Sequence, residues 1–172
     1  GTQFKNLHLF GGRETDGTEG VMNDARLLNL HQLLVWESDQ TPGASPRPAV
    51  RHGHSSVFHA FSGRTIMFGG TRTGGLINDN NKVWGLFIEN GHQGQDWKWL
   101  ELTTDEHQGI GYPPARHRHT AVIVDNSMFV WGGEGASGTV LNDLWRLDLV
   151  ATPNPKWTKL TVSGGPAARY GH

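Results

Sequence analysis

The sequence contains one unit repeated three times, and this repeat constrains the fold more than any other feature. Each unit has an aromatic residue followed by two glycines, then an Asn-Asp pair, then a tryptophan, and finally a proline followed by Arg-x-x-His. The glycine pairs begin at Gly11, Gly69 and Gly132, so the spacings are 58 and 63 residues. Four features that recur three times in one order indicate a repeat architecture built from one supersecondary unit.

The residues that mark the repeat are interpreted as structural. Glycines permit tight turns and close strand packing, tryptophans pack between neighbours, and a repeated Arg and Asp can form buried bidentate pairs. In the second unit the tryptophan is either Trp97 or Trp99. The marking residues are Gly11, Gly12, Gly69, Gly70, Gly132, Gly133, Asp24, Asp79, Asp143, Trp36, Trp97, Trp157, Arg51, Arg116 and Arg169.

Short apolar segments between these marks predict strands, because they are four to seven residues long and rich in Val, Ile, Thr, Phe or Trp. They are residues 55–60, 65–68, 82–86, 97–102, 120–124, 128–131, 144–149 and 157–161. Residues 22–35 are the most helix-like stretch, but the Asn-Asp register aligns them with two of these segments, so we predict a strand there too. Four strands per unit, joined by tight turns, form one blade of a β-propeller.

The order Arg-x-Gly-His, apolar strand, Phe-Gly-Gly, Asn-Asp-x-Trp-x-Leu and Trp-x-x-Leu resembles the kelch repeat, most closely in residues 131–160. The resemblance covers nearly the whole chain and implies an all-β, kelch-type β-propeller with four-stranded antiparallel blades. We expect an incomplete first blade in residues 1–36, further blades in 51–102 and 116–161, and the start of another in 169–172. Three blades form an incomplete ring, because propellers typically close with four to eight.

Composition excludes several function classes. The 15 Lys and Arg residues and 16 Asp and Glu residues give a formal net charge of −1, so no field of one sign steers nucleic acid or a charged membrane to the chain. No apolar run is long enough to predict a membrane span. The absence of cysteine excludes disulfides, thiolate metal sites and cysteine nucleophiles from this segment. Cysteine usage does not reveal the compartment, and we favour an intracellular location.

Histidine pairs form a candidate metal site. His52 and His54, and likewise His117 and His119, are spaced i, i+2, so in a strand both members would face one side. Two such pairs could ligate zinc or copper. Because the pairs occupy a repeated position, we favour the alternative that these histidines hydrogen-bond to backbone across the blade.

Some enzymes contain kelch-like propellers, so the resemblance also implies catalytic alternatives. Galactose oxidase uses copper and a Tyr-Cys crosslink, which a chain without cysteine cannot form. Nitrile-specifier proteins bind iron through Glu-x-x-x-Asp-x-x-x-His; the nearest match here begins with Glu101 and Asp105 but has Gly109 in the third place, and His107 is out of register. We therefore expect no metal, no cofactor and no catalytic residue in this segment.

Binding residues are expected on the face where the loops after the second and fourth strands emerge. Strand direction alternates within a blade, so these loops share one face, and they are long: 13–21, 71–77, 134–140, 37–50, 103–113 and 162–166. The other face has minimal turns except for residues 88–96. Long loops on a rigid scaffold often carry binding residues, and Arg and aromatic residues are enriched at interfaces. The candidate partner contacts are Arg13, Arg47, Arg72, Tyr112 and Glu134.

The sequence leaves two functions open. The leading hypothesis is a non-catalytic kelch-propeller scaffold for protein–protein interaction, within a longer multidomain protein. Its partners would be a protein bound on the long-loop face, and the remaining blades or another copy of the chain. The alternative is a segment of a kelch-like enzyme, such as a small-molecule isomerase, an oxidase or a specifier-type protein, whose active site lies partly in other blades.

An isolated three-blade arc leaves two apolar blade faces and two strand edges uncovered, and both features promote association. We expect the 172-residue chain alone to be poorly soluble or oligomeric. Sedimentation of the purified chain tests this expectation. A stable, well-folded monomer at high concentration would show that the missing blades contribute less than we expect.

Overall fold

The computed structural model describes residues 6–13, 21–29, 36–38, 46–72, 75–76, 82–91, 94–106 and 108–172. Within these residues the regular structure is β-strand apart from one short 3-10 helix, η1 (Ala136–Gly138). The predicted strand over residues 22–35 is confirmed for residues 22–29, which belong to β2, and residues 30–35 lie outside the described part.

The strands form three antiparallel sheets in chain order, plus one small hairpin. The first sheet contains β1 (Asn6–Arg13), β2 (Val21–Asn29) and β3 (Trp36–Ser38). The second contains β4 (Ser55–His59), β5 (Arg64–Phe68), β8 (Val83–Gly91) and β9 (Gly94–Leu102). The third contains β10 (Thr120–Val124), β11 (Ser127–Trp131), β12 (Leu144–Asp148) and β13 (Lys156–Leu160). The hairpin is formed by β6 (Thr71–Arg72) and β7 (Gly75–Leu76).

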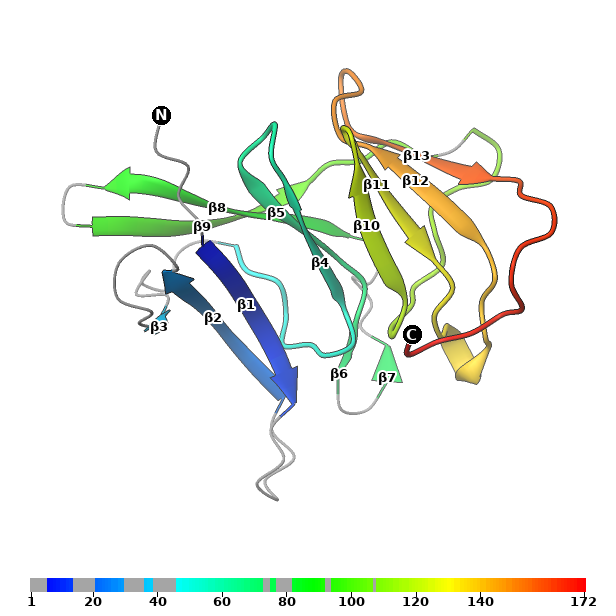
Figure 1. Ribbon diagram of the computed structural model, residues 1–172, viewed down its shortest axis with the longest axis horizontal. Coiled ribbons are helices and arrows are strands. Elements are labelled where there is room, and N and C mark those ends of the chain that lie inside the picture. The colour runs from blue at the N-terminus through cyan, green and yellow to red at the C-terminus, as the bar shows by residue number, and fades with distance from the viewer. Residues whose placement is uncertain are drawn as a thin grey trace.

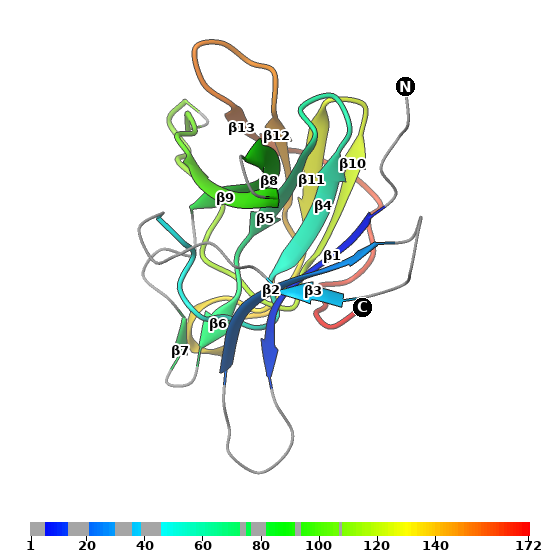
Figure 2. The same cartoon turned by 90° about the vertical axis from the view of Figure 1, so that its left-hand side faces the viewer.

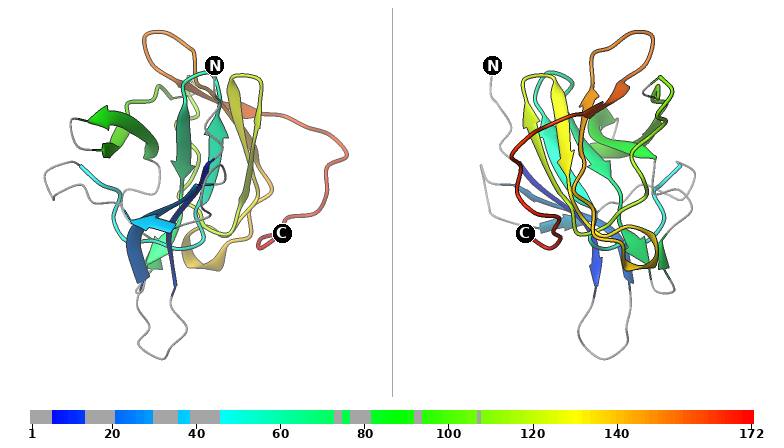
Figure 3. Two further views of the ribbon diagram at one scale, coloured as in Figure 1. Left: turned by 60° about the vertical axis from the view of Figure 1, so that its left-hand side comes forward. Right: turned by 90° about the vertical axis from the view of Figure 1, so that its right-hand side faces the viewer.

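The three sheets lie side by side as blades of an arc, with β4 next to β10 (Figure 1). The β6–β7 hairpin and η1, which follow the second strands of their blades, lie at the same end of the arc in both side views (Figures 2 and 3). This arrangement confirms the predicted all-β propeller of four-stranded antiparallel blades in an open ring. The assignment of residues 1–36, 51–102, 116–161 and 169–172 to separate blades stays a prediction.

The prediction of a long loop over residues 88–96 is wrong. The ladder between β8 and β9 continues through Glu89↔Asp96 and Asn90↔Gln95 to Gly91↔Gly94, so the connection is a tight hairpin. These two strands have nine residues each, whereas β12 and β13 have five each. The polar and glycine residues of this stretch are typical of a loop, but the extended pairing of the two strands accommodates them.

The hydrophobic core lies between the blades. Successive residues of a strand point to opposite faces of its sheet, so each blade contributes one set of side chains to each neighbour. One buried cluster joins the second and third blades: Ile66, Phe68, Val83, Met128, Val130, Trp145, Leu147 and Trp157. The other joins the first and second blades: Phe10, Met67, Trp84, Leu86, Trp97 and Trp99.

The strand register identifies the repeated tryptophan. Trp157 pairs with Leu147 in the third blade, and Trp99 pairs with Leu86 in the second. In the first blade, Trp36 pairs with Leu28. The structure therefore places Trp99, not Trp97, at the position of Trp157, although both tryptophans of β9 are buried.

A buried arginine joins the ends of the strands within the third blade. Arg116 is fully buried, and its Nε donates to Pro114 O (3.1 Å) while Nη1 donates to Gly132 O (3.0 Å). Its two terminal nitrogens also form the predicted bidentate pair with the Asp143 carboxylate, at 2.7 and 2.8 Å. Trp145 Nε1 donates to the same carboxylate at 2.6 Å.

The hydrogen bonds from the repeated arginine to backbone carbonyls recur in the other units. Arg51, also fully buried, donates through Nε to Ala49 O and through Nη1 to Gly69 O, both at 3.0 Å. Arg169 donates through Nε to Ala167 O at 3.1 Å. The repeated arginine thus closes the same local turn in each unit.

In the described part of the second blade, Lys82 occupies the ladder position that corresponds to Asp143, and the predicted pairing of Arg51 with Asp79 stays a prediction. Val83 starts β8 and pairs with Phe68, as Leu144 starts β12 and pairs with Trp131. The residue before each strand is therefore Lys82 in the second blade and Asp143 in the third. The sequence-based alignment placed Asp79 there, but Asp79 and the side chain of Asp24 lie outside the described residues.

The glycine pairs have the left-handed backbone that glycine favours. Gly69 and Gly70 have φ of +70° and +105°, and Gly132 and Gly133 have φ of +62° and +100°. Gly70 donates its N–H to Arg116 O of the next blade, and Gly133 donates to Arg169 O, both at 2.9 Å. In the first blade, the ladder register shifts between Phe10 and Gly12, so Gly11 lies at an irregularity of β1.

Replacement of Gly69 by Ala should destabilise the fold more than replacement of Gly63. A Cβ at Gly69 would lie 2.5 Å from Arg116 O, whereas a Cβ at Gly63 (φ +65°) would meet nothing within 4 Å. Gly63→Ala should cost about 1 kcal/mol from its backbone conformation alone, and Gly69→Ala a further ~1–3 kcal/mol from overpacking. Urea denaturation of both variants measures the difference, and equal losses would show that the close contact relaxes freely.

Candidate functional site

A row of left-handed residues links the blades at the inner edge of the arc. Gly53, Arg118 and Gly171 occupy the third position of the three Arg-x-x-His segments, with φ of +66°, +54° and +69°. Arg118 donates its backbone N–H to Gly53 O (2.7 Å), and Gly171 donates to Arg118 O (2.8 Å). These hydrogen bonds fix the three residues relative to one another.

Arg118, the middle residue of this row, belongs to a cluster of polar and charged side chains. His117 and Glu134 exchange two backbone hydrogen bonds of 2.9 Å, which bring the Glu134 carboxylate to 3.5 Å from His117 Nε2 and 3.6 Å from Arg118 Nη1. We call His117, Arg118 and Glu134 the rim cluster. The Arg118 guanidinium carbon also lies 5.7 Å from the centre of the exposed Tyr170 ring.

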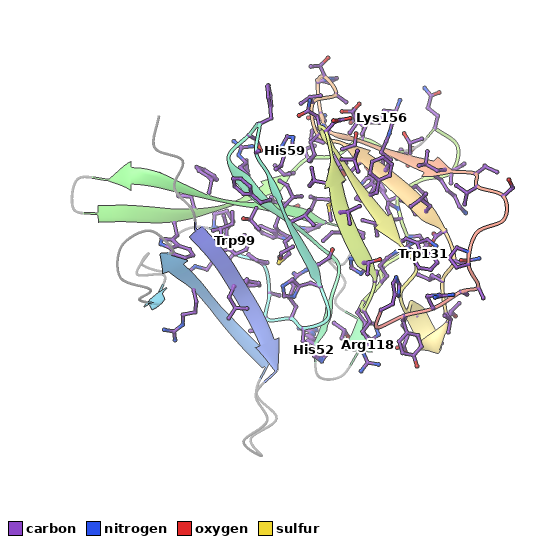
Figure 4. All side chains as sticks on the ribbon, viewed as in Figure 1. His52, His59, Trp99, Arg118, Trp131 and Lys156 are labelled. Carbon is purple, nitrogen blue, oxygen red and sulfur yellow. The ribbon has the colours of Figure 1, made fainter. Side chains whose placement is uncertain are left out.

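The rim cluster lies at the end of the arc that carries η1 and the β6–β7 hairpin. Figure 4 shows Arg118 beside His52 at this end, and His59 and Lys156 at the opposite end. His52 pairs with Thr71 through two backbone hydrogen bonds, as His117 pairs with Glu134. The same backbone framework therefore presents Thr71 in the second blade and a carboxylate in the third.

Burial lowers the pKa of three histidines in this region, His54, His117 and His119. Desolvation lowers the pKa of His117, and Arg118 and His52 lower it further, although Glu134 acts in the opposite direction. Desolvation also lowers the pKa of His54 to about 4 and that of His119 to about 3, helped by the adjacent arginines Arg51 and Arg116.

The pKa of Asp143 is also lowered, but for a different reason. Desolvation raises it, but the hydrogen bonds and charge of Arg116 and the hydrogen bond from Trp145 together hold it below 3.8.

The histidine pairs do not have the strand geometry that the sequence predicted. Gly53 and Arg118 separate their members with positive φ, so the alternation of a strand does not apply. The hydrogen bonds also differ from the prediction: His119 Nε2 bonds to the Ser55 hydroxyl of the preceding blade (2.7 Å) rather than to backbone. His172 Nε2 repeats this bond with the Thr120 hydroxyl (2.9 Å).

The predicted partner contacts are divided among several places. Glu134 belongs to the rim cluster, and exposed Arg72 follows Thr71 in β6 at the same end of the arc. Arg13 ends β1, and its side chain lies outside the described part; Arg47 is half-buried in the segment before β4. Tyr112, 38% exposed, donates to Thr104 O (3.0 Å).

The segment near Tyr112 does not stay on the long-loop face, contrary to the prediction for residues 103–113. Asp105 accepts from Trp157 N and donates to Pro155 O, so this part of the chain runs parallel to the start of β13. Lys156, which pairs with Asp105, lies at the end opposite to Arg118 in Figure 4. The connection that follows β9 therefore runs along the side of the third blade to the end opposite to Arg118.

Sequence reasoning missed His117, Arg118 and Tyr170 as surface residues. They lie inside the Arg-x-x-His motif, which was interpreted as structural apart from the metal-ligand alternative considered for His117. The available signal was a difference between units: the third position is glycine at Gly53 and Gly171 but arginine at Arg118.

An open groove of about 530 Å³ lies at the outer part of the third blade, lined in part by Val140, Leu144, Leu160 and Val162. In the second blade, Leu102 pairs with Val83 as Leu160 pairs with Leu144. Leu102 packs against the core shared with the third blade. The groove thus corresponds to a joint between blades.

Within the described residues, no group of three or more His, Cys, Asp or Glu side chains is arranged to hold a metal ion. The described part also contains no helix long and apolar enough to cross a membrane.

Comparison with known proteins identifies the repeat. Residues 3–172 match the family described as the KLHDC2/KLHL20/DRC7 Kelch-repeats domain. The chain belongs to the kelch-repeat family.

Kelch-repeat relatives share the sequence at moderate identity. The chain is 31% identical over 169 residues to human multiple epidermal growth factor-like domains protein 8, covering 96% of this chain and 5% of that protein. It is 27% identical over 159 residues to rat kelch domain-containing protein 10, covering 91% of this chain and 34% of that protein. The kelch chain thus spans well under half the length of these curated relatives.

A solved structure has the same fold. The structure of YjhT superimposes with a TM-score of 0.64 at 17% sequence identity, covering 96% of this kelch chain and 51% of that chain. This likeness concerns the propeller fold.

Acid should destabilise the kelch blades at pH values where few carboxylates titrate. A histidine of the unfolded chain binds a proton below about pH 6.5, whereas His119 stays neutral in the fold down to about pH 3. The stability contributed by neutral His119 is therefore complete above pH 6.5 and falls as the pH decreases, by about 2 kcal/mol at pH 5. His54 acts in the same direction.

Urea denaturation between pH 7 and pH 5 measures this loss. The His119→Gln variant keeps a side chain that can hydrogen-bond to Ser55 but removes the titration, so its stability should fall less over the same range. An equal fall in the variant and the parent would assign the pH dependence to other groups.

Proposed function

We propose that this kelch-repeat chain is part of a protein–protein interaction scaffold and that its partner binds on the face carrying the rim cluster. The observation that carries this proposal is the half-exposed Arg118 on a backbone fixed by hydrogen bonds to two neighbouring units. Because this backbone is already fixed, it loses little freedom on binding, which favours affinity.

The composition of this face also supports a protein partner. Arg72 and Tyr170 are exposed there beside the rim cluster, and Arg and Tyr are enriched at binding hot spots. We propose Arg13 and Arg47 as more peripheral contacts, whereas Tyr112 follows a segment that leaves this face. Because the chain spans 5% and 34% of the two curated relatives described above, the activity and partners of the whole protein belong to this proposal as well.

We further propose that another blade covers the free face of the third blade. Val57 of β4 packs into the joint between the second and third blades. Val122 lies at the same place in β10, two residues after Thr120 as Val57 lies two after Ser55, and it is 55% exposed. A further blade, from a longer chain or from another copy, would bury it as the third blade buries Val57.

Site-specific photocrosslinking distinguishes the two ends of the arc. A photoreactive amino acid placed at Arg72 or Tyr170 should crosslink a protein partner in cells that make the intact protein. The controls are Phe61, which is 78% exposed in the β4–β5 turn, and Val150, which follows β12; both lie at the opposite ends of strands. Equal or stronger crosslinking from the control positions would contradict the proposed binding face.

A further inference from the structure

Arg146 lies in the middle of the sheet face that the third blade turns away from the second. Trp145 and Leu147, its neighbours in β12, point into the core shared with the second blade, and successive residues of a strand point to opposite faces. Arg146 pairs with Phe129 of β11 and with Thr158 of β13. Its Nε atom is buried, but within the described part of the chain this atom has no hydrogen-bond partner.

The second blade shows what happens to this position when a neighbouring blade covers it. Gly85 pairs with Ile66 of β5 as Arg146 pairs with Phe129 of β11, so glycine stands at the equivalent place. Gly85 is buried, and Ile66 belongs to the core shared with the third blade. A blade that covered the third blade in the same way would therefore bury the Arg146 guanidinium.

A guanidinium buried in this way requires a charged partner, because an unpaired charge is costly to remove from water. The buried guanidinium of Arg116 has such a partner in Asp143. Asp148 lies two residues after Arg146 on the same face, but it accepts a hydrogen bond from Val150 N at 3.1 Å. Among the described residues Arg146 forms no ion pair, so its partner has to come from whatever covers this face.

We propose that a further blade of a longer chain covers the free face of the third blade and contributes an Asp or Glu carboxylate that pairs with Arg146. This inference rests on the proposed cover of that face and adds the chemistry of the joint. A carboxylate matches a guanidinium through two parallel hydrogen bonds, which satisfy the donors that burial removes from water. The pair would lie inside a joint between blades, at the place that Gly85 occupies in the preceding joint.

A second copy of the chain does not meet this requirement. In a ring closed by two copies, the first blade of one copy would cover the third blade of the other. Phe10 packs toward the second blade, so Leu9, 52% exposed, and its partner in the ladder, Arg26, lie on the opposite face of the first blade. The described charge on that face is therefore positive, and it would repel Arg146 in a buried joint. The charges favour a blade of different sequence.

Thermal unfolding of the intact protein at pH 7 and pH 5 tests the pair. Arg146→Met leaves the partner carboxylate buried without its cation, so the melting temperature at pH 7 should fall by about 6 °C or more. The fall should be smaller at pH 5, because a buried unpaired carboxylate has a raised pKa and takes up a proton there. Equal falls at the two pH values would overturn the proposal, since the packing of the arginine stem does not depend on pH.

Arg64→Met is the matched control. Arg64 lies on the corresponding face of the second blade, two residues before Ile66, and its guanidinium carbon is 5.2 Å from the centre of the Phe87 ring. Among the described residues it forms no ion pair, so its replacement should lower the melting temperature equally at both pH values. Arg146→Lys, which keeps the charge, should cost less than Arg146→Met at pH 7, and an equal or larger loss would contradict the pair.

Two measurements separate this inference from the proposal on which it rests. Val122→Asn should lower the melting temperature of the intact protein by about 5 °C or more if a blade covers the free face. Little change would show that the face is uncovered and would overturn both proposals. A large fall for Val122→Asn beside a pH-independent fall for Arg146→Met would overturn the carboxylate alone.

Sedimentation equilibrium of the intact protein then identifies the source of the carboxylate. A monomer, or an oligomer that Arg146→Met leaves assembled, assigns the carboxylate to the same chain, as we expect. An oligomer that dissociates in the Arg146→Met variant would assign it to a second copy and would overturn the proposal.

Discussion

Arg116 holds the third blade together through its buried guanidinium and joins it to the second blade through its backbone carbonyl. A charge removed from water must have its donors satisfied, and Arg116 meets this requirement with the carbonyls of Pro114 and Gly132 and with the Asp143 carboxylate. Its own carbonyl accepts the N–H of Gly70 from the preceding blade. The side chain thus orders one blade while the backbone of the same residue orders the joint. The glycine pair is required because its left-handed backbone brings one carbonyl to the guanidinium and one N–H to the next unit.

Much of this arrangement could be predicted from the sequence, because the interactions lie within one unit and recur. The glycine pairs, the Arg116–Asp143 pair and most strands follow from residues that repeat in the same order. Prediction was weaker where spacing in sequence and register in the sheet differ. Val83 lies five positions after Asn78, whereas Leu144 lies only two positions after Asn142, so matching the Asn-Asp pairs aligned Asp79 with Asp143 while the ladder puts Lys82 there. Trp97 and Trp99 posed the same problem, which only the pairing with Leu86 decides.

The rim cluster was beyond sequence reasoning for another reason. Its members come from an inner segment and from the loop after β11, and only the two backbone hydrogen bonds between His117 and Glu134 bring them together. Glu134 was selected because it lies in a long loop, whereas Arg118 was absorbed into a structural motif. Tyr112, selected on the same loop argument as Glu134, follows a segment that runs beside β13 instead. Loop length therefore indicated the end of the arc on which Glu134 lies, but it does not show where a twisted blade carries its outer connection.

The positions at which the units differ separate structural from functional demands. At the place of Asp143 the second blade has Lys82, which pairs with Glu101 at the surface, and the indole N–H of buried Trp84 has no hydrogen-bond partner, unlike that of Trp145. Within the described residues, that difference leaves a buried indole N–H without a hydrogen bond and creates no exposed contact near the inner edge. At the place of Gly53 and Gly171 the chain has Arg118, a change that strains the backbone and places a guanidinium on the surface. Both changes oppose stability, but only the second adds a group with unused donors on a face fixed by inter-blade hydrogen bonds. Of the two departures from the repeat, the one at Arg118 is therefore the one that we propose for binding, because it exposes new chemistry at a cost to the backbone.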